Sequence, residues 1–282
     1  MNTNFTDNFV PAEFDWLNLR FGFDSQSRNK DLEKKMLQNL SQNQLNVLDL
    51  GAGSAANLYY FFSKLPNDSK WTLIDRDVDL LNKINFNQFQ LKHTPEILHS
   101  NFLDPQCIIY QNKYDLILAN AVFDLCTKNH FMQLLANLNE SCTISNETVL
   151  YFTINITPQI EFLPKLDEDN IFIDLFFKHM QREQSFGHAM GPNCVTQMKE
   201  CFDFHKFNYE SKKSNWVILP RDQKMLFSNL EFIENSCSEL ISTQMRKTLN
   251  HWISIRKKQI TNKELTLTVG HEDLLAYKKP TT

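Results

Sequence analysis

The stretch from Val47 to Asn57, VLDLGAGSAAN, constrains the fold more than any other part of the chain. A short apolar run typical of a buried strand leads into a turn with glycines at 51 and 53, and a helical pattern follows. Such a turn lets the backbone approach a ligand closely at the start of a helix. The chain has only 6 glycines among 282 residues, well below the usual ~7%. This pair therefore predicts a nucleotide-type ligand at a strand–helix turn.

Apolar runs alternate with helical periods on both sides of this turn, which is typical of a doubly wound α/β sheet. Most of the runs are short and continuous, as in parallel strands buried on both faces. Strands are predicted at 47–50, 71–74, 97–100, 114–119, 148–156, 207–217 and 265–277. Helices are predicted at 31–40, 55–64, 78–86, 131–138 and 193–204. The expected fold is a mostly parallel, seven-stranded sheet of this class.

The chain reads as a single domain over residues 1–282, without a linker, repeat or low-complexity tract. Residues 1–44 are expected to form an N-terminal helical cap, and residues 45–156 the ligand-binding core. Residues 157–192 are predicted to be a long connection that serves as a substrate loop. The C-terminal half, 193–282, carries an insertion at 220–262 that reads as two helices.

Bulk composition excludes several classes of protein. The net charge of −4 and pI near 6.1 do not indicate a general polyanion binder. A basic segment with Arg246, Lys247, Arg256, Lys257 and Lys258 is interpreted as a solvated helix face, or else as a seat for an anionic substrate or partner. No apolar stretch reaches the roughly 18 residues of a membrane span, and the N-terminus has no signal-peptide pattern. Six cysteines without a CxxC pair indicate reduced thiols in a cytoplasmic chain and no metal site.

Two acids identify the class of nucleotide. Asp49 lies two residues before the first glycine, where a carboxylate would repel a pyrophosphate but suit an ammonium or sulfonium group. Asp75 ends the second predicted strand, where a ribose-binding acid belongs in a βαβ unit. An acid for ribose and an acid for a cationic tail, without a phosphate cradle, favour S-adenosylmethionine (SAM) over NAD.

These motifs resemble those of class I SAM-dependent methyltransferases, including bacterial enzymes that act on small molecules. DLGAG at 49–53 is similar to the first motif of the family, and WTLID at 71–75 to the second, whose acid holds the ribose hydroxyls. HSNFLD at 99–104 resembles the adenine-contacting segment, with Asn101 in place of the usual Asp and Phe102 supplying a ring. YDLILANAVFD at 114–124 resembles the fourth strand and the loop below the transferred methyl group.

The resemblance implies a set of site residues. The cofactor is expected to contact Asp49, Gly51, Gly53, Asp75, Asn101, Phe102 and Arg20. Asn120 and His188 are the candidate catalytic residues, because Asn120 follows the fourth strand and histidine titrates near neutral pH. Trp16, Phe123 and Met190 are the candidate substrate-binding residues. Each candidate outside the glycine motif could instead have a structural role. Asp124 could be a helix cap, and Arg28 could lie at the surface.

The expected function is transfer of a methyl group from SAM to an O, N or S atom of a small molecule. The alternatives are methylation of RNA or protein, or SAM binding without catalysis. Nucleic-acid binding is not expected from the acidic balance, although the basic segment leaves a local contact open.

Overall fold

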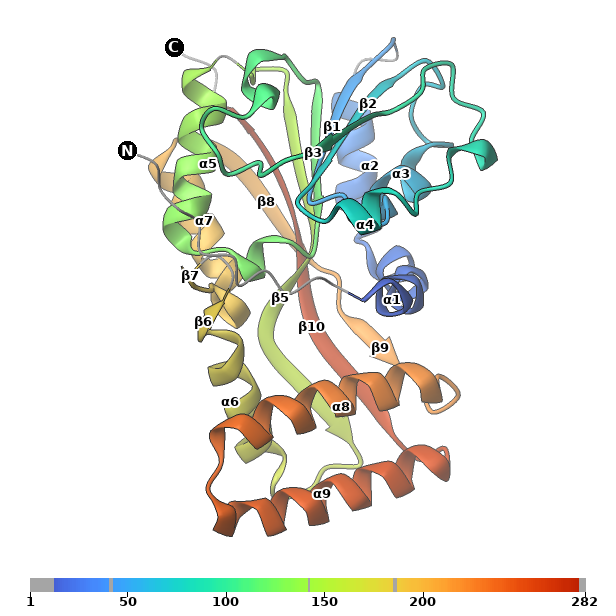
Figure 1. Ribbon diagram of the computed structural model, residues 1–282, viewed down its shortest axis with the longest axis vertical. Helices are drawn as coiled ribbons and strands as arrows, with labels where there is room; N and C mark the ends of the chain where they lie inside the picture. The colour runs from blue at the N-terminus through green and yellow to red at the C-terminus, as the bar shows by residue number, and fades with distance from the viewer. Residues whose placement is uncertain (1–12, 41–42, 142, 185–186, 279–282) are drawn as a thin grey trace.

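The computed structural model describes residues 13–40, 43–141, 143–184 and 187–278, and its centre is one mixed sheet (Figure 1). The strand order is β3-β2-β1-β4-β5-β10-β8, and β9 also pairs with β10. The strands are β1 Asn46–Leu50, β2 Lys70–Asp75, β3 Glu96–His99, β4 Leu116–Asn120, β5 Val149–Leu163, β8 Phe207–Lys213, β9 Trp216–Ile218 and β10 Thr266–Lys278. The first five are parallel, and β10 is antiparallel to β5 and β8. The predicted doubly wound, mostly parallel sheet is confirmed.

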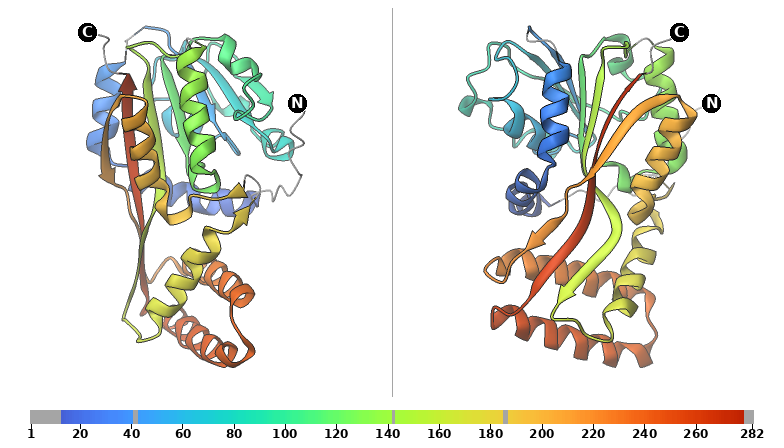
Figure 2. Two further views of the ribbon diagram at one scale, coloured as in Figure 1. Left: turned by 90° about the vertical axis from the view of Figure 1, so that its left-hand side faces the viewer. Right: turned by 180° about the vertical axis from the view of Figure 1, so that it is seen from behind.

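Helices cover both faces of this sheet (Figure 2). On one face, α5 (Lys128–Glu140) and α7 (Cys194–Phe204) pack on β1, β4 and β5 through a core that includes Phe131, Phe152 and Phe202. On the other, α2 (Lys30–Asn39) and α3 (Ala56–Phe61) pack through Met36 and Phe61. The strands are therefore buried on both sides, which explains their continuous apolar runs.

The sheet extends well beyond the carboxyl end of β4. β5 and β10 continue together as a long antiparallel pair, covered by α6 (Asp169–Met180), α8 (Gln223–Leu240) and α9 (Thr243–Thr261) (Figure 1). A separate core, with Phe172 and Trp252 fully buried, holds this extension together. The prediction of a long connection at 157–192 is thus wrong in its first half, because β5 runs to Leu163 and α6 follows.

Pro158 explains that error. Proline interrupts a strand pattern because it lacks a ladder N–H. In the structure the register between β5 and β10 shifts between Val269 and His271, so that residues 157–159 form a bulge opposite Gly270. A Cβ atom on Gly270 would lie 2.3 Å from Thr157 Oγ1. The bulge therefore accommodates the proline, and the glycine allows the close approach.

Shorter elements connect these layers. They are α1 (Phe14–Ser27), α4 (Val78–Leu81), the hairpin of β6 (Glu183–Gln184) and β7 (Gly187–His188), and the 3-10 turns Phe86–Gln88, Ile108–Gln111, Phe123–Leu125 and Gly191–Asn193. The helix predicted at 78–86 ends early, because Asn85 caps a separate 3-10 turn by accepting a hydrogen bond from Asn87 N at 3.1 Å. Among the described helices, none combines the length and apolar character needed to cross a membrane. Cys142 and Phe186 lie outside the described residues.

Candidate functional site

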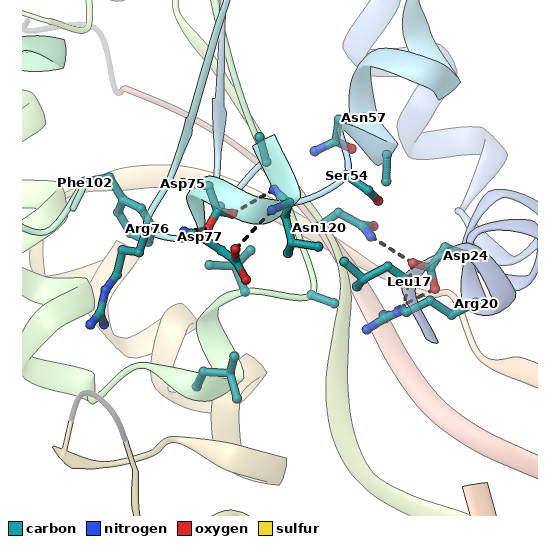
Figure 3. A pocket seen from close by; sticks show the side chains of 18 residues that line it. Leu17, Arg20, Asp24, Ser54, Asn57, Asp75, Arg76, Asp77, Phe102 and Asn120 are labelled. Carbon is teal, nitrogen blue, oxygen red and sulfur yellow. Dashed lines mark hydrogen bonds and ion pairs between the residues drawn. The ribbon is translucent and has the colours of Figure 1, made fainter. Parts of the chain in front are cut away.

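Two cavities meet at the carboxyl edge of the parallel strands. The first, here called the glycine pocket, encloses about 170 Å³ at the carboxyl ends of β1, β2 and β4. Figure 3 shows the side chains that line it. Its lining consists of residues 17, 20, 24, 51–54, 56–57, 75–77, 80, 102, 120–122 and 125. It lies where ligands bind in open α/β sheets, outside the ends of the strands.

The turn after β1 brings backbone to the surface of this pocket. Gly51 and Gly53 have φ values of +62° and +51°, a region that side-chain-bearing residues rarely adopt. A Cβ atom on Gly51 would lie 2.7 Å from Val122 Cγ2, so the turn packs tightly on the loop after β4. The glycines therefore permit the positive φ angles of this turn and, at Gly51, its close packing on Val122.

Asp75 ends β2 at the rim of the same pocket. Its Oδ2 accepts a hydrogen bond from Gly53 N at 2.7 Å, and its Oδ1 accepts one from Asp77 N at 2.8 Å. Burial raises the pKa of this carboxyl, against the lowering effect of the backbone donors. Each carboxylate oxygen retains acceptor capacity for a ligand hydroxyl.

Asp49 does not line the pocket, although the sequence predicts a ligand contact there. It is 1% exposed, and its Oδ1 accepts a hydrogen bond from Asn57 Nδ2 at 2.7 Å. Arg28, also buried, donates from Nη2 to Asn57 Oδ1 at 2.7 Å. Burial raises the pKa of Asp49 to about 7. Asp49 therefore lies outside the pocket lining and orients Asn57, which lines the pocket.

Asp24 on α1 connects the loop after β4 with the long extension. It accepts hydrogen bonds from Arg20 Nε at 3.1 Å, Asn120 Nδ2 at 2.9 Å and Trp216 Nε1 at 3.1 Å. The Arg20 guanidinium lies 5.0 Å from the ring centroid of Trp216 and 5.9 Å from that of Trp16. One buried carboxylate therefore fixes an arginine, an amide and an indole relative to each other.

The second cavity, here the tryptophan pocket, encloses about 130 Å³ between α1, α6, α8 and the extended strands. Its lining is mostly aromatic and branched aliphatic, and consists of residues 16, 20, 121, 124, 154, 156, 160, 176, 216, 229, 232, 233, 267, 269 and 271. Arg20 and Ala121 line both cavities. The two pockets are therefore adjacent, with the loop after β4 between them.

Some of the remaining predicted residues line these pockets, and others do not. Phe102 and Asn120 line the glycine pocket, and Trp16 lines the tryptophan pocket. Asn101 lines neither, because its side chain accepts a hydrogen bond from Leu103 N at 3.0 Å and shapes the turn.

Three further candidates lie away from both cavities. Phe123 is fully buried and packs on Phe131 and Phe152, and Met190 is buried while its N–H donates to Cys126 O at 2.7 Å. His188 is exposed on β7, where it pairs with Glu183. Hydrophobic residues next to a motif are here core residues, and the histidine lies on a hairpin that does not contribute to either lining.

Sequence reasoning missed Asp24, Ala121, Asp124, Trp216 and His271 as pocket residues. Ala121 could have been identified from the sequence, because it directly follows Asn120 in the motif loop. In the structure its φ of +53° marks a sharp turn. Trp216 and His271 carried none, because they come together only through the pairing of β9 with β10. Their ring centroids are 4.6 Å apart.

No group of three or more His, Cys, Asp and Glu residues with metal-binding geometry occurs in the described part of the chain. Its five described cysteines, 107, 126, 194, 201 and 237, are buried free thiols. Burial raises the pKa of Cys126 and of Cys194, so both remain protonated near neutral pH.

Comparisons with known proteins show the family and the fold of this chain. The model of a family described as a methyltransferase domain matches residues 41–224. A cyclopropane synthase from Mycobacterium tuberculosis shares 13% identity with a TM-score of 0.51, covering 97% of this chain and 98% of that chain. A mycolic acid cyclopropane synthase, solved in complex with SAH and CTAB, shares 13% identity with a TM-score of 0.54 and covers 99% of both chains. These two structures share the fold. A comparison with curated proteins gives no match.

Proposed function

Because this chain belongs to the methyltransferase-domain family, we propose that it transfers a methyl group from SAM in the glycine pocket to a small molecule in the tryptophan pocket. The cofactor of the family is SAM, as the sequence predicts, and the chain is a transferase. The assignment of the two ligands to the two pockets and the small-molecule acceptor are the proposed parts.

The glycine pocket has the groups that SAM requires. The carboxylate of Asp75 is placed to accept hydrogen bonds from the ribose hydroxyls, and the ring of Phe102 offers a surface for adenine. Gly53, which has no side chain, leaves room for the ligand beside the backbone. At the opposite end, Arg20 and Asn57 are polar partners for the amino-acid tail.

The observation that carries the proposal is the shared wall of the two pockets. Ala121 and Arg20 belong to both linings, and Ala121 has the smallest side chain of the loop after β4. A methyl donor in one cavity and an acceptor in the other would meet across this wall. The acceptor cavity of about 130 Å³ is of a size for a small molecule.

Methyl transfer makes limited chemical demands on the protein. SAM supplies an activated methyl group on a sulfonium, which an O, N or S lone pair displaces in line. The positive charge disperses in the transition state, so positioning and exclusion of water contribute most of the rate acceleration. The apolar walls of the tryptophan pocket exclude water, and the Asp24 network holds Arg20 and Asn120 in place.

The test is incubation of the protein with methyl-labelled SAM and a cell extract that has been separated into metabolite, protein and RNA fractions. We expect label in the metabolite fraction, and less label at limiting SAM with an Asp75→Ala variant, whose cofactor affinity is weaker. Label confined to protein or RNA would contradict the small-molecule acceptor. Calorimetric absence of SAM binding would contradict the assignment of the glycine pocket.

A further inference from the structure

In the part of the chain that the structure describes, the tryptophan pocket is lined by a carboxylate with an unpartnered buried oxygen. Asp124 stands at the 3-10 turn after β4, and its Oδ1 is buried without a hydrogen-bond partner within the described residues. A buried carboxylate oxygen in this state is costly unless a ligand supplies a donor. This atom is therefore the strongest indication of what the pocket binds.

His271 adds a second acceptor. Its Nδ1 lies 3.1 Å from Val269 O. A carbonyl only accepts, so Nδ1 carries the proton and Nε2 has the lone pair. Burial, and then the positive charge of Arg20, lowers the pKa of His271 to about 3, so the ring is neutral near pH 7. Asn229 donates one N–H of Nδ2 to Met225 O at 2.9 Å, so its Oδ1 and its second N–H remain for a ligand.

One donor at the pocket is already in use, because Trp216 Nε1 donates to Asp24. Arg20 donates to the same carboxylate from Nε and Nη2, and its other three N–H groups remain. The walls between these groups are rings and branched aliphatic chains, with Trp16 and Phe232 in edge contact at 4.8 Å between centroids. A ligand that satisfies this cavity needs an apolar, ring-sized body and a polar group that donates a hydrogen bond.

We propose, on the basis of the function above, that the acceptor molecule is a compact apolar compound with a nucleophilic O–H or N–H, and that Asp124 receives its proton during methyl transfer. The lone pair of the O or N atom forms the new bond to the methyl carbon. The methyl–sulfur bond breaks, and its electron pair stays on sulfur. The proton of the acceptor passes to Asp124 Oδ1; where the polar group is an amine, its further N–H is available to His271 Nε2 or Asn229 Oδ1. Atoms and charge balance without a further reactant.

Two observations place Asp124 in this role. It follows β4 by four residues, in the same loop as Ala121, which borders the glycine pocket. Burial raises the pKa of Asp124, an effect that the charge of Arg20 partly offsets. A carboxylate with a raised pKa is a stronger proton acceptor than one in water.

The experiment compares four matched probes on protein saturated with S-adenosylhomocysteine: 2-phenylethanol, 2-phenylethylamine, ethylbenzene and 3-phenylpropionate. Ligand-observed NMR gives their affinities. We expect at least one of the two donor-bearing probes to bind at least fivefold more tightly than ethylbenzene and than the anion. Asp124→Ala should abolish that preference, and His271→Phe, which keeps a ring against Trp216, should weaken binding of the amine alone. Asp167→Ala, at an exposed acid away from both pockets, is the control.

Methyl incorporation gives the second readout. Asp124→Asn should lower the label transferred to the metabolite fraction at least tenfold, with S-adenosylhomocysteine affinity unchanged. Tighter binding of the anion, absence of any donor preference, or unchanged methyl incorporation would overturn this inference. Loss of S-adenosylhomocysteine binding in the unaltered protein would instead overturn the proposed function, so the two failures are distinguishable.

Discussion

The glycine pocket and the tryptophan pocket lie side by side but are built in different ways. The glycine pocket is formed largely by turns that directly follow β1, β2 and β4, and its key contacts involve backbone and one carboxylate. The tryptophan pocket is assembled from α1, α6, α8, β9, β5 and β10, and its lining is mostly apolar. In the proposed function the first pocket binds the cofactor and the second binds the acceptor, so the second would set the specificity of this chain.

The largest effect is expected at the glycine turn. Gly53 has a φ of +51°, and its ideal Cβ lies 4.0 Å from Asp75 Oδ2. A β-branched residue is strained in this region and fills the space of the ligand. Gly53→Val should reduce SAM affinity by at least ~100-fold, roughly 2.7 kcal/mol, in calorimetry. Gly22→Ala, where nothing lies within 4 Å, is the control. If the valine variant retained full affinity, the cofactor would have to bind elsewhere.

Asp75 should give the next largest effect. Asp75→Ala removes hydrogen bonds to the cofactor and frees the Gly53 and Asp77 amides. We expect SAM affinity to fall by roughly 1–3 kcal/mol, measured by the same titration. The neighbouring exposed Asp79→Ala should leave affinity within about twofold. Equal effects of the two substitutions would mean that charge near α4, rather than a specific contact, governs binding.

Asp24 couples the two pockets, because it lines the glycine pocket and holds Trp216 of the tryptophan pocket. Asp24→Asn replaces a charged acceptor of Arg20, Asn120 and Trp216 by an amide that accepts at one atom only. Methyl transfer at saturating SAM should fall about tenfold, close to 1.4 kcal/mol, and SAM affinity should fall as well, because Asp24 holds Arg20. Steady-state kinetics and calorimetry measure the two quantities, with exposed Asp15→Asn on the same helix as the control. Unchanged methyl transfer at saturating SAM would show that Asp24 does not align the two pockets.

A further effect is expected on stability and comes from Asp49, which lies outside the glycine pocket. Burial raises its pKa from 3.8 to about 7, so the folded state binds this proton more tightly than the unfolded state. Stability from this group is present below about pH 4 and is lost as the pH rises towards 7, by at most ~1.4 kcal/mol per pH unit.

Asp49→Asn keeps an acceptor for Asn57 and removes the titration. Denaturant unfolding of the ligand-free protein between pH 4 and 7 should therefore give a flatter profile for the variant. Asp75 and Asp124, whose pKa values are also raised, act in the same direction in both proteins and cancel in the difference. Identical profiles would refute the titration of Asp49 in this range.

The same contrast explains what could be predicted from the sequence. The Asp49–Gly53 motif and Asp75 were visible because one strand–turn–helix unit holds its own chemistry within about 30 residues. Trp216 and His271 were not, because their proximity depends on the pairing of distant strands and on a bulge at Pro158. The sequence favours His188 as a catalytic residue because it is titratable and lies between two glycines. In the structure this segment belongs to a hairpin, and the histidine is exposed.

The most direct test of the central claim is a crystal structure of the protein with S-adenosylhomocysteine. We expect the ribose hydroxyls to lie within hydrogen-bond distance of Asp75. We also expect the sulfur to lie at the wall formed by Ala121 and Arg20 and to face the tryptophan pocket. A sulfur atom directed away from that wall, or a ligand outside the glycine pocket, would contradict that claim.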